Sequence, residues 1–430
     1  MKARLLRGVI LLALIDPAFS QLPPLRIPEG IGVNIHFVTG HEADLDMIAA
    51  AGFRWVRMDF TWEAIERRRG EYDWSGYDEL TRNLEKRGLR ALYILDYSNR
   101  LYEDMVQTTN PITGRPEETT ASPRKPESVE AFARWAGAAA ARYAGRGVVW
   151  EIWNEPNIFF WRPRPNVEEY VRLARATVES VRRADPRAVI IAPGISGFDP
   201  PFMERFLASG ILGGLDGVSV HPYRFRRPPE TAAVDYQRLR EQVDRHAPAD
   251  RAGRVPIVSS EWGWSTDGKD VSLETQAAYL VRQQLFHLFV GVPLSIWYDW
   301  KNDGRDPQER EHNFGVVDAD LKPKPAYHAM RTLARELAGY SVERRHSVGR
   351  ESDWVLVLRD GRGRVKLAAW TLEEPHEVRL NVDGPVPADG WRVVRGDGRV
   401  ERVAGSGDTL VLELRELPQY VELGTARPRP

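Results

Sequence analysis

From about residue 31 onward, short β-rich runs alternate with longer segments whose apolar residues recur at helical spacing. The short runs are rich in β-branched and aromatic residues, which favours strands. The predicted strands are Gly32–His36, Trp55–Asp59, Ala91–Leu95, Val148–Trp153, Val189–Ala192, Gly217–His221, Pro256–Glu261 and Pro293–Tyr298. The predicted helices are Tyr77–Arg87, Val129–Tyr143, Val167–Arg183, Tyr236–His246, Leu273–Leu288 and Pro325–Leu337.

This alternation predicts an α/β fold with parallel strands, because each helix returns the chain to the same edge of the sheet. Eight strand–helix units over about 310 residues fit a (β/α)8 TIM barrel, which we assign to residues 21–340. An open doubly wound sheet is the alternative. It is disfavoured because no glycine-rich phosphate loop follows the first predicted strand.

The pattern changes after Tyr340. Short alternating runs such as Trp354–Leu358, Val365–Trp370 and Thr409–Leu414 are separated by turns that contain Asp and Gly. We expect a C-terminal antiparallel β-sandwich at residues 341–425 and a frayed tail at residues 426–430. Packing as a brace against the barrel is the more economical role for the sandwich, and glycan binding is the alternative.

Two long polar segments follow predicted barrel strands. Tyr97–Pro126 is rich in proline and comes after the third strand, and Trp300–Val316 comes after the eighth. Loops after barrel strands lie on the face that carries the active site in this fold, so both segments are candidate walls of a substrate cleft.

The first 20 residues have the pattern of a cleavable secretory signal. Lys2, Arg4 and Arg7 precede a short apolar run, and Ala18 and Ser20 place small residues before Gln21. The apolar run is too short to span a bilayer. We therefore expect an exported protein, periplasmic or extracellular, with no membrane span.

Composition excludes several classes of function. The formal net charge is -1, so no overall field favours nucleic acid. The chain has no cysteine, which excludes disulfides and thiolate chemistry. No histidine or carboxylate spacing is typical of a zinc site, and we expect neither a metal nor a cofactor. We expect a monomer.

The candidate chemistry lies at the ends of the predicted strands. Glu155 follows the fourth strand and Glu261 ends the seventh, while His36, Arg57 and His221 lie at the ends of the first, second and sixth. In a TIM barrel these positions meet on one rim. Two carboxyl groups placed across a sugar ring are sufficient to cleave a glycosidic bond, one as a protonated acid and the other as an ionised nucleophile. Glu151, which precedes the fourth strand's motif, is interpreted as an ion-paired strand residue.

The motif Trp-Asn-Glu-Pro at residues 153–156, together with Ser-Glu-Trp-Gly at residues 260–263, resembles clan A of the glycoside hydrolases. The resemblance implies that Glu155 is the acid/base and Glu261 the nucleophile. It also implies a reaction with net retention, for which the two carboxyl groups must lie about 5–5.5 Å apart.

The same resemblance suggests roles for five further residues. Asn154 corresponds to the residue that bonds the sugar 2-hydroxyl, and Arg57 to an arginine that keeps the nucleophile ionised. Tyr223 is expected to donate a hydrogen bond to the nucleophile, and His221 to line the subsite. Trp297 resembles the aromatic platform beneath the reactive sugar. From its position alone, His36 is either a sugar ligand or a hydrogen-bonded structural histidine.

Within the clan, residues 32–36 (Gly-Val-Asn-Ile-His), 297–304 and 313–317 most resemble family 39, and especially its exopolysaccharide-degrading endoglycosidases, with family 5 as a near neighbour. The implied partner is a polysaccharide or oligosaccharide. The alternatives are a family 5-like cellulase or mannanase, a transglycosylase, and a non-catalytic glycan-binding protein on the same scaffold.

Overall fold

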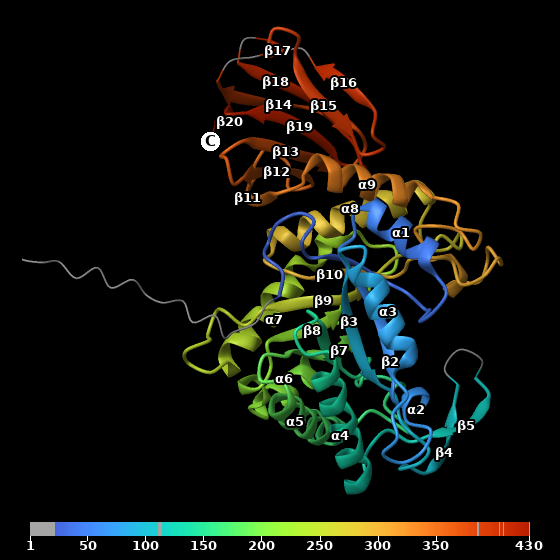
Figure 1. Ribbon diagram of the computed structural model, residues 1–430. Coiled ribbons are helices and arrows are strands. Elements are labelled where there is room, and N and C mark those ends of the chain that lie inside the picture. The colour runs from blue at the N-terminus through green and yellow to red at the C-terminus, as the bar shows by residue number, and fades with distance from the viewer. Residues whose placement is uncertain (1–21, 111–113, 385–386, 404, 407, 430) are drawn as a thin grey trace, which may run out of the picture.

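The computed structural model describes residues 22–110, 114–384, 387–403, 405–406 and 408–429, and the expected export signal at residues 1–20 lies outside them. Eight parallel strands close into a barrel at the centre of the molecule (Figure 1), which confirms the predicted (β/α)8 architecture. In their order around the barrel, the strands are β1 (Ile31–Asn34), β10 (Ser295–Trp297), β9 (Ile257–Trp262), β8 (Gly217–His221), β7 (Val189–Ser196), β6 (Val149–Ile152), β3 (Arg90–Asp96) and β2 (Trp55–Thr61).

Helices connect these strands and cover the outside of the barrel. They are α1 (Glu42–Ala51), α2 (Trp62–Ile65), α3 (Ser75–Glu85), α4 (Pro126–Arg142), α5 (Val167–Ala184), α6 (Pro200–Ala208), α7 (Ala233–His246), α8 (Leu273–Phe289) and α9 (Pro325–Glu336), with 3-10 turns η1 (Ile211–Gly213), η2 (Pro229–Ala232) and η3 (Glu311–Asn313). The N-terminus of helix α5 is fixed by a side chain that caps it, Asn166. The Asn166 side chain accepts hydrogen bonds from the backbone N–H groups of Glu168 and Glu169.

The barrel strands have apolar residues on both faces, because successive side chains point alternately inward and outward. One buried cluster fills the interior and consists of Trp55, Leu92, Ile94, Val149, Val189, Ile191, Val258, Leu294 and Ile296. The residues between them pack outward against the helices in a larger cluster. Further along β2 and β6, the next inward positions are Arg57 and Glu151, so the interior becomes polar toward the carboxyl ends of the strands.

The long segment after β3 contains a two-stranded hairpin, where the sequence predicted only a loop. Strands β4 (Met105–Thr109) and β5 (Pro116–Thr120) pair antiparallel and project from the barrel (Figure 1). Both strands carry mainly polar side chains and alternate between exposed and half-buried positions. Without an apolar face, a strand has little of the period-two signal by which it is recognised.

The C-terminal part forms two antiparallel sheets, as predicted. The first contains β11 (Tyr340–His346), β12 (Asp353–Asp360), β13 (Val365–Thr371), β19 (Gln419–Gly424), β15 (Trp391–Arg395) and β16 (Val400–Val403). The second contains β17 (Gly405–Ser406), β18 (Thr409–Leu414), β14 (His376–Asp383) and β20 (Arg427–Pro428).

The prediction of a frayed tail at residues 426–430 is wrong for residues 426–428, and Pro430 lies outside the described residues. Arg427 and Pro428 form strand β20, which pairs antiparallel with Val382 and Asp383 of β14. The side chain of Ala426 is buried in the sandwich core. Strand β20 completes one edge of the smaller sheet, and its two-residue length leaves no periodic pattern in the sequence.

The six-stranded sheet lies between the smaller sheet and the barrel helices α8 and α9 (Figure 1). Val355 and Val357 of β12 face the sandwich core, whereas Trp354 and Leu356 belong to the barrel's outer cluster. The Trp354 ring packs edge-on against Phe286 of α8 at 6.0 Å between centroids. The sandwich therefore braces the barrel through shared hydrophobic packing.

A buried polar contact fixes the same interface. The indole N–H of Trp370 donates to Oε1 of Glu230 at 2.8 Å, and Nη2 of Arg282 donates to Oε2 of Glu230 at 2.7 Å. Both Glu230 and Arg282 are buried. Each charge is paired, which buried charges require.

Among the described residues, no helix combines the length and the apolarity needed to cross a bilayer.

Replacing Trp354 with alanine should destabilise the protein strongly, because the side chain is 5% exposed and joins the sheet to α8. Truncating a buried tryptophan typically costs about 3–5 kcal/mol. We expect a clear fall in the apparent Tm by scanning calorimetry. Val400→Ala is the control, since Val400 is 58% exposed and exposed substitutions usually stay within about 0.5 kcal/mol. Equal Tm values for the two variants would contradict the proposed packing.

Candidate active site

The carboxyl ends of the barrel strands bring the predicted polar residues together. Arg57 of β2 and His221 of β8 are fully buried, and Glu261 lies near the end of β9 with its side chain 13% exposed. Asn34 of β1 and Glu151 of β6 complete the group. Hydrogen bonds from Arg57 connect all five side chains, including one from its Nη2 to Nε2 of His221 at 3.3 Å. The rim predicted from the sequence is therefore one connected polar cluster.

Each oxygen of Glu261 accepts a strong hydrogen bond. Nη1 of Arg57 donates to Oε2 at 2.6 Å, and the hydroxyl of Tyr223 donates to Oε1 at 2.7 Å. Burial alone raises the pKa of Glu261, but His221, Arg57 and the Tyr223 hydrogen bond outweigh it and lower the pKa below its usual value. Glu261 is therefore ionised at neutral pH, as a nucleophile must be.

Glu155 lies in the turn after β6, where the backbone is unusually bent. Trp153 and Glu155 have φ values of 68° and 47°, in the left-handed region that side chains rarely adopt. The N–H of Glu155 donates to the carbonyl of Gly194 at 2.9 Å, which holds the turn against β7. Strained residues of this kind concentrate at functional sites, and this turn carries Glu155, which lies close to Glu261.

The two glutamates are close together. One oxygen of Glu155, one oxygen of Glu261 and a ring nitrogen of His221 all lie within 4.8 Å of one another. Carboxyl groups about 5–5.5 Å apart are typical of retaining glycosidases, and inverting enzymes need about 6.5–9.5 Å to place a water between them. The spacing therefore fits direct attack by one carboxylate.

Arg57 of β2 links the site to three other strands of the barrel, β1, β6 and β9. Besides Glu261, its guanidinium donates to Glu151 at 3.0 Å, to Asn34 at 3.2 Å and to Asn154 at 2.9 Å. The arginine is 1% exposed and Glu151 is fully buried. Glu151 is thus the ion-paired strand residue expected from the sequence, bonded to Nε of Arg57 while the nucleophile bonds to Nη1.

His221 lies between the two glutamates and does not reach the open cleft. Its Nδ1 is 3.0 Å from Oε1 of Glu155, and its Nε2 is 3.1 Å from the hydroxyl of Ser260. The ring has no exposed surface. His221 is therefore a positioning residue that orients Glu155, rather than the lining of the subsite that was predicted.

The amide of Asn154 is fixed on both sides. Its oxygen accepts from Arg57, and its Nδ2 donates to the hydroxyl of Tyr97 at 3.0 Å. Sequence reasoning missed Tyr97, although it directly follows β3 and so occupies the rim position where a polar residue is expected. Burial raises the pKa of Tyr97 well above its usual value, so the hydroxyl stays protonated.

His36 lies on the rim beside β10 and is hydrogen-bonded as well as accessible. Its Nδ1 is 3.0 Å from Oδ1 of Asp303 and 3.9 Å from Oδ2 of Asp299, and its side chain is 37% exposed. Burial lowers the pKa of His36, but the bond to Asp303 and the charge of Asp299 raise it to about 9. The imidazole is therefore a cation at neutral pH, held in place by two acids.

The prediction of a sugar platform at Trp297 is wrong. Ile296 belongs to the cluster inside the barrel, so alternation turns Trp297 outward. There it stacks on Trp264 at 5.7 Å between ring centroids and has no exposed surface. The aromatic residue at the rim is Tyr298, one position later, whose ring lies 5.5 Å from that of His36. The motif resemblance therefore identified the correct strand end, but it assigned the platform to a residue whose side chain points to the outer face of the barrel.

The closed barrel and the paired glutamates at the ends of β6 and β9 define the class of a clan A glycoside hydrolase. Residues 28–302 match the model of the cellulase family, glycosyl hydrolase family 5. The chain belongs to this family.

Comparison with individual proteins gives a similar result. A solved family 39 glycoside hydrolase from Bacteroides cellulosilyticus WH2 is 25% identical with a TM-score of 0.77, over 93% of this chain and 81% of that one. β-Xylosidases of Caldicellulosiruptor saccharolyticus and Geobacillus stearothermophilus are 24% and 26% identical over 45% and 58% of this chain. Since the matches cover 42% and 56% of those enzymes, the chain spans about half the length of these relatives. The predicted likeness to family 39 is confirmed.

Replacing Tyr223 with phenylalanine should raise the pKa of Glu261, because one hydrogen bond to the ionised carboxylate is lost. The acidic limb of the kcat/KM profile should then move to higher pH. A bond to a charged group contributes about 1.5–3 kcal/mol, so we expect kcat/KM to fall about 10- to 100-fold. Tyr327→Phe is the control, since that hydroxyl donates to the carbonyl of Met47, away from the site. An acidic limb that does not move would contradict the assignment.

Proposed function

We propose that this protein is an exported retaining glycoside hydrolase that cleaves O-glycosidic bonds within a polysaccharide, with a bacterial exopolysaccharide as its substrate. The observation that carries the proposal is the approach of Glu155 and Glu261 to within 4.8 Å, with Glu261 ionised. The names of the β-xylosidase relatives make β-xylosides the first small substrates to test.

The reaction proceeds in two displacements. Protonated Glu155 gives its proton to the glycosidic oxygen while Glu261 attacks the anomeric carbon. The bond to the leaving group breaks, and a covalent glycosyl-enzyme forms. Ionised Glu155 then takes a proton from water, whose oxygen attacks the same carbon and releases Glu261. Two inversions give net retention.

The surrounding residues prepare the two glutamates for these roles. Arg57 and Tyr223 keep Glu261 ionised and fix the orientation of its carboxylate. His221 holds Glu155 through Nδ1, and its contact with the hydroxyl of Ser260 fixes the ring. Asn154 is held by Arg57 and Tyr97 at the position that the clan resemblance assigns to the sugar 2-hydroxyl. Such preorganisation lowers the cost of reaching the transition state.

Cavities on two flanks of the rim support action within a chain. One, lined in part by Tyr97 and Phe160, lies on the side of β3 and β6. The other, lined in part by His36 and Asp299, lies on the side of β1 and β10. A substrate that occupies both extends beyond the reactive sugar in more than one direction, as an internal segment of a polysaccharide does.

The function is tested by product release from bacterial and plant polysaccharides and aryl β-xylosides, with wild type beside Glu155→Gln and Glu261→Gln. We expect retained products from wild type only, with rates at least about 1,000-fold lower in Glu261→Gln, because no covalent intermediate forms. NMR of the first-formed anomer checks retention, and product analysis separates hydrolysis from transglycosylation. Wild-type turnover by Glu261→Gln excludes the assignment. Glycan binding by wild type without any cleavage would favour the binding-protein alternative.

Export is part of the same proposal and rests on the pattern of residues 1–20. N-terminal sequencing of the protein from the culture medium or periplasm should give a chain that starts at Gln21. Full-length protein found only in the cytoplasm would contradict export.

A further inference from the structure

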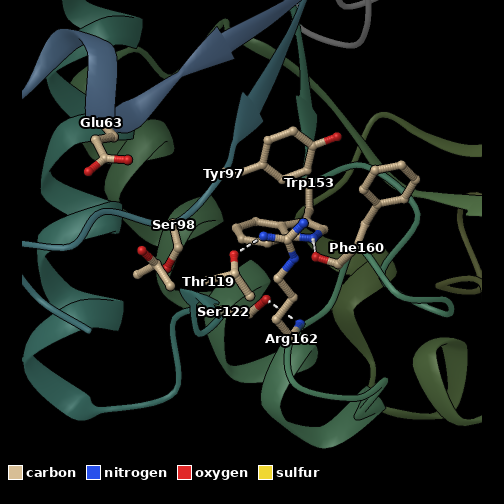
Figure 2. A pocket seen from close by; sticks show the side chains of 9 residues that line it. Glu63, Tyr97, Ser98, Thr119, Ser122, Trp153, Phe160 and Arg162 are labelled. Atoms are coloured by element: carbon tan, nitrogen blue, oxygen red, sulfur yellow. Dashed lines mark hydrogen bonds between the residues drawn. The ribbon is translucent and has the colours of Figure 1, made fainter. Parts of the chain in front are cut away.

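A cavity of about 190 Å³ lies beside the acid/base end of the rim, against the hairpin β4–β5 (Figure 2). It touches the catalytic cluster through Tyr97, whose hydroxyl accepts the hydrogen bond from Asn154. Its lining comes from four segments of the barrel face and consists of Glu63, Tyr97, Ser98, Thr119, Thr120, Ser122, Trp153, Phe160 and Arg162. A group bound in this side pocket is therefore next to the sugar that is cleaved.

One wall of the side pocket is aromatic. The rings of Tyr97 and Phe160 lie nearly parallel, with 18° between their planes and 5.9 Å between their centroids. The indole N–H of Trp153 donates to the carbonyl of Phe160 at 3.3 Å and fixes its backbone (Figure 2). This wall matches the apolar C–H face of a sugar ring, since binding sites are lined mainly by hydrophobic and aromatic groups.

The opposite wall is polar and held in place by its own hydrogen bonds. The guanidinium of Arg162 donates to the hydroxyl of Thr119, and its backbone N–H donates to the hydroxyl of Ser122 at 2.8 Å (Figure 2). The side chain of Arg162 remains 35% exposed, and a guanidinium has five N–H donors. Several donors are therefore available for the hydroxyl groups of a ligand.

Charges around the side pocket are balanced. Nη2 of Arg162 lies 3.9 Å from Glu117, and Glu63 forms an ion pair with Arg100. The lining itself holds one acid, Glu63, and one base, Arg162, so a ligand carboxylate gains no net attraction here. Hydroxyl groups, which donate and accept, can bond to both kinds of side chain. The charge pattern favours a neutral ligand.

The volume limits the ligand to about one ring. Pockets for drug-sized molecules usually measure about 300–1,000 Å³, and this cavity is smaller. It nevertheless exceeds by about tenfold the ~15 Å³ that a single water requires. One hexose or pentose ring is the carbohydrate unit that suits this volume.

We infer that the side pocket binds one neutral sugar unit of the glycan, adjacent to the unit held between Glu155 and Glu261. The inference rests on the proposed function and adds a preference to it. The enzyme favours neutral oligosaccharides over isolated glycosides, and Phe160 and Arg162 carry that preference.

The test compares Phe160→Ala and Arg162→Ala with wild type on p-nitrophenyl β-xyloside and on xylotetraose. The ratio of kcat/KM for xylotetraose to that for the aryl xyloside should fall at least about tenfold in both variants, because only the tetraose reaches the side pocket. Arg164→Ala is the matched control, an exposed arginine two residues away that does not line the pocket. Its ratio should equal that of wild type.

An equal loss on both substrates, or no loss on either, overturns the inference while the proposed function stands. If wild type cleaves neither xyloside, calorimetric titration of xylotetraose, cellotetraose and mannotetraose decides, using Glu261→Gln and Glu261→Gln/Arg162→Ala. At least about tenfold weaker binding of one tetraose by the double variant supports the side pocket. Unchanged affinity for every tetraose, or no binding at all, overturns it.

Discussion

The buried guanidinium of Arg57 is the interaction on which the site depends. It bonds to Asn34, Glu151, Asn154 and Glu261, which come from three other barrel strands and their following turns. Removing one partner of a buried charge pair typically costs about 3–5 kcal/mol, because the other charge stays behind without compensation. The position of the nucleophile is therefore coupled to the positions of the neighbouring strand ends, and neither can shift without the other.

The barrel supports this polar cluster by confining apolar residues to its outer face and to the interior near the amino ends of the strands. Trp55 and Val149 fill the interior one inward position below Arg57 and Glu151. Outside, the C-terminal sandwich covers α8 through Trp354 and fixes Glu230 through Trp370. The strands that carry the glutamates are thus packed on both faces, which is what a site needs when its groups must hold their positions to within a fraction of an ångström.

The sequence predicted the fold and most of the site because strand ends are visible in it. Glu155, Glu261 and Arg57 lie at or near the ends of predicted strands, and parallel strands bring those ends together. The prediction for Trp297 was wrong because the sequence does not show which residues of β10 point into the barrel. The structure shows that Ile296 points inward, so the next residue, Trp297, points outward. The hairpin β4–β5 was missed since polar strands carry no period-two pattern. Tyr97 was missed because its role depends on the tertiary contact with Asn154. The contacts of His221 with Glu155 and Ser260 could not be predicted from the sequence, because they depend on tertiary geometry.

The described residues of the hairpin β4–β5 belong to none of the buried hydrophobic clusters, yet Thr119 and Thr120 border the cavity beside Asn154. Insertions and exchanges in such a segment leave the core packing intact, and loops tolerate them at small entropic cost. Selection can therefore alter this hairpin without disturbing the bonds that Arg57 makes. The same scaffold can therefore change which glycan it binds while the residues that break the glycosidic bond stay the same.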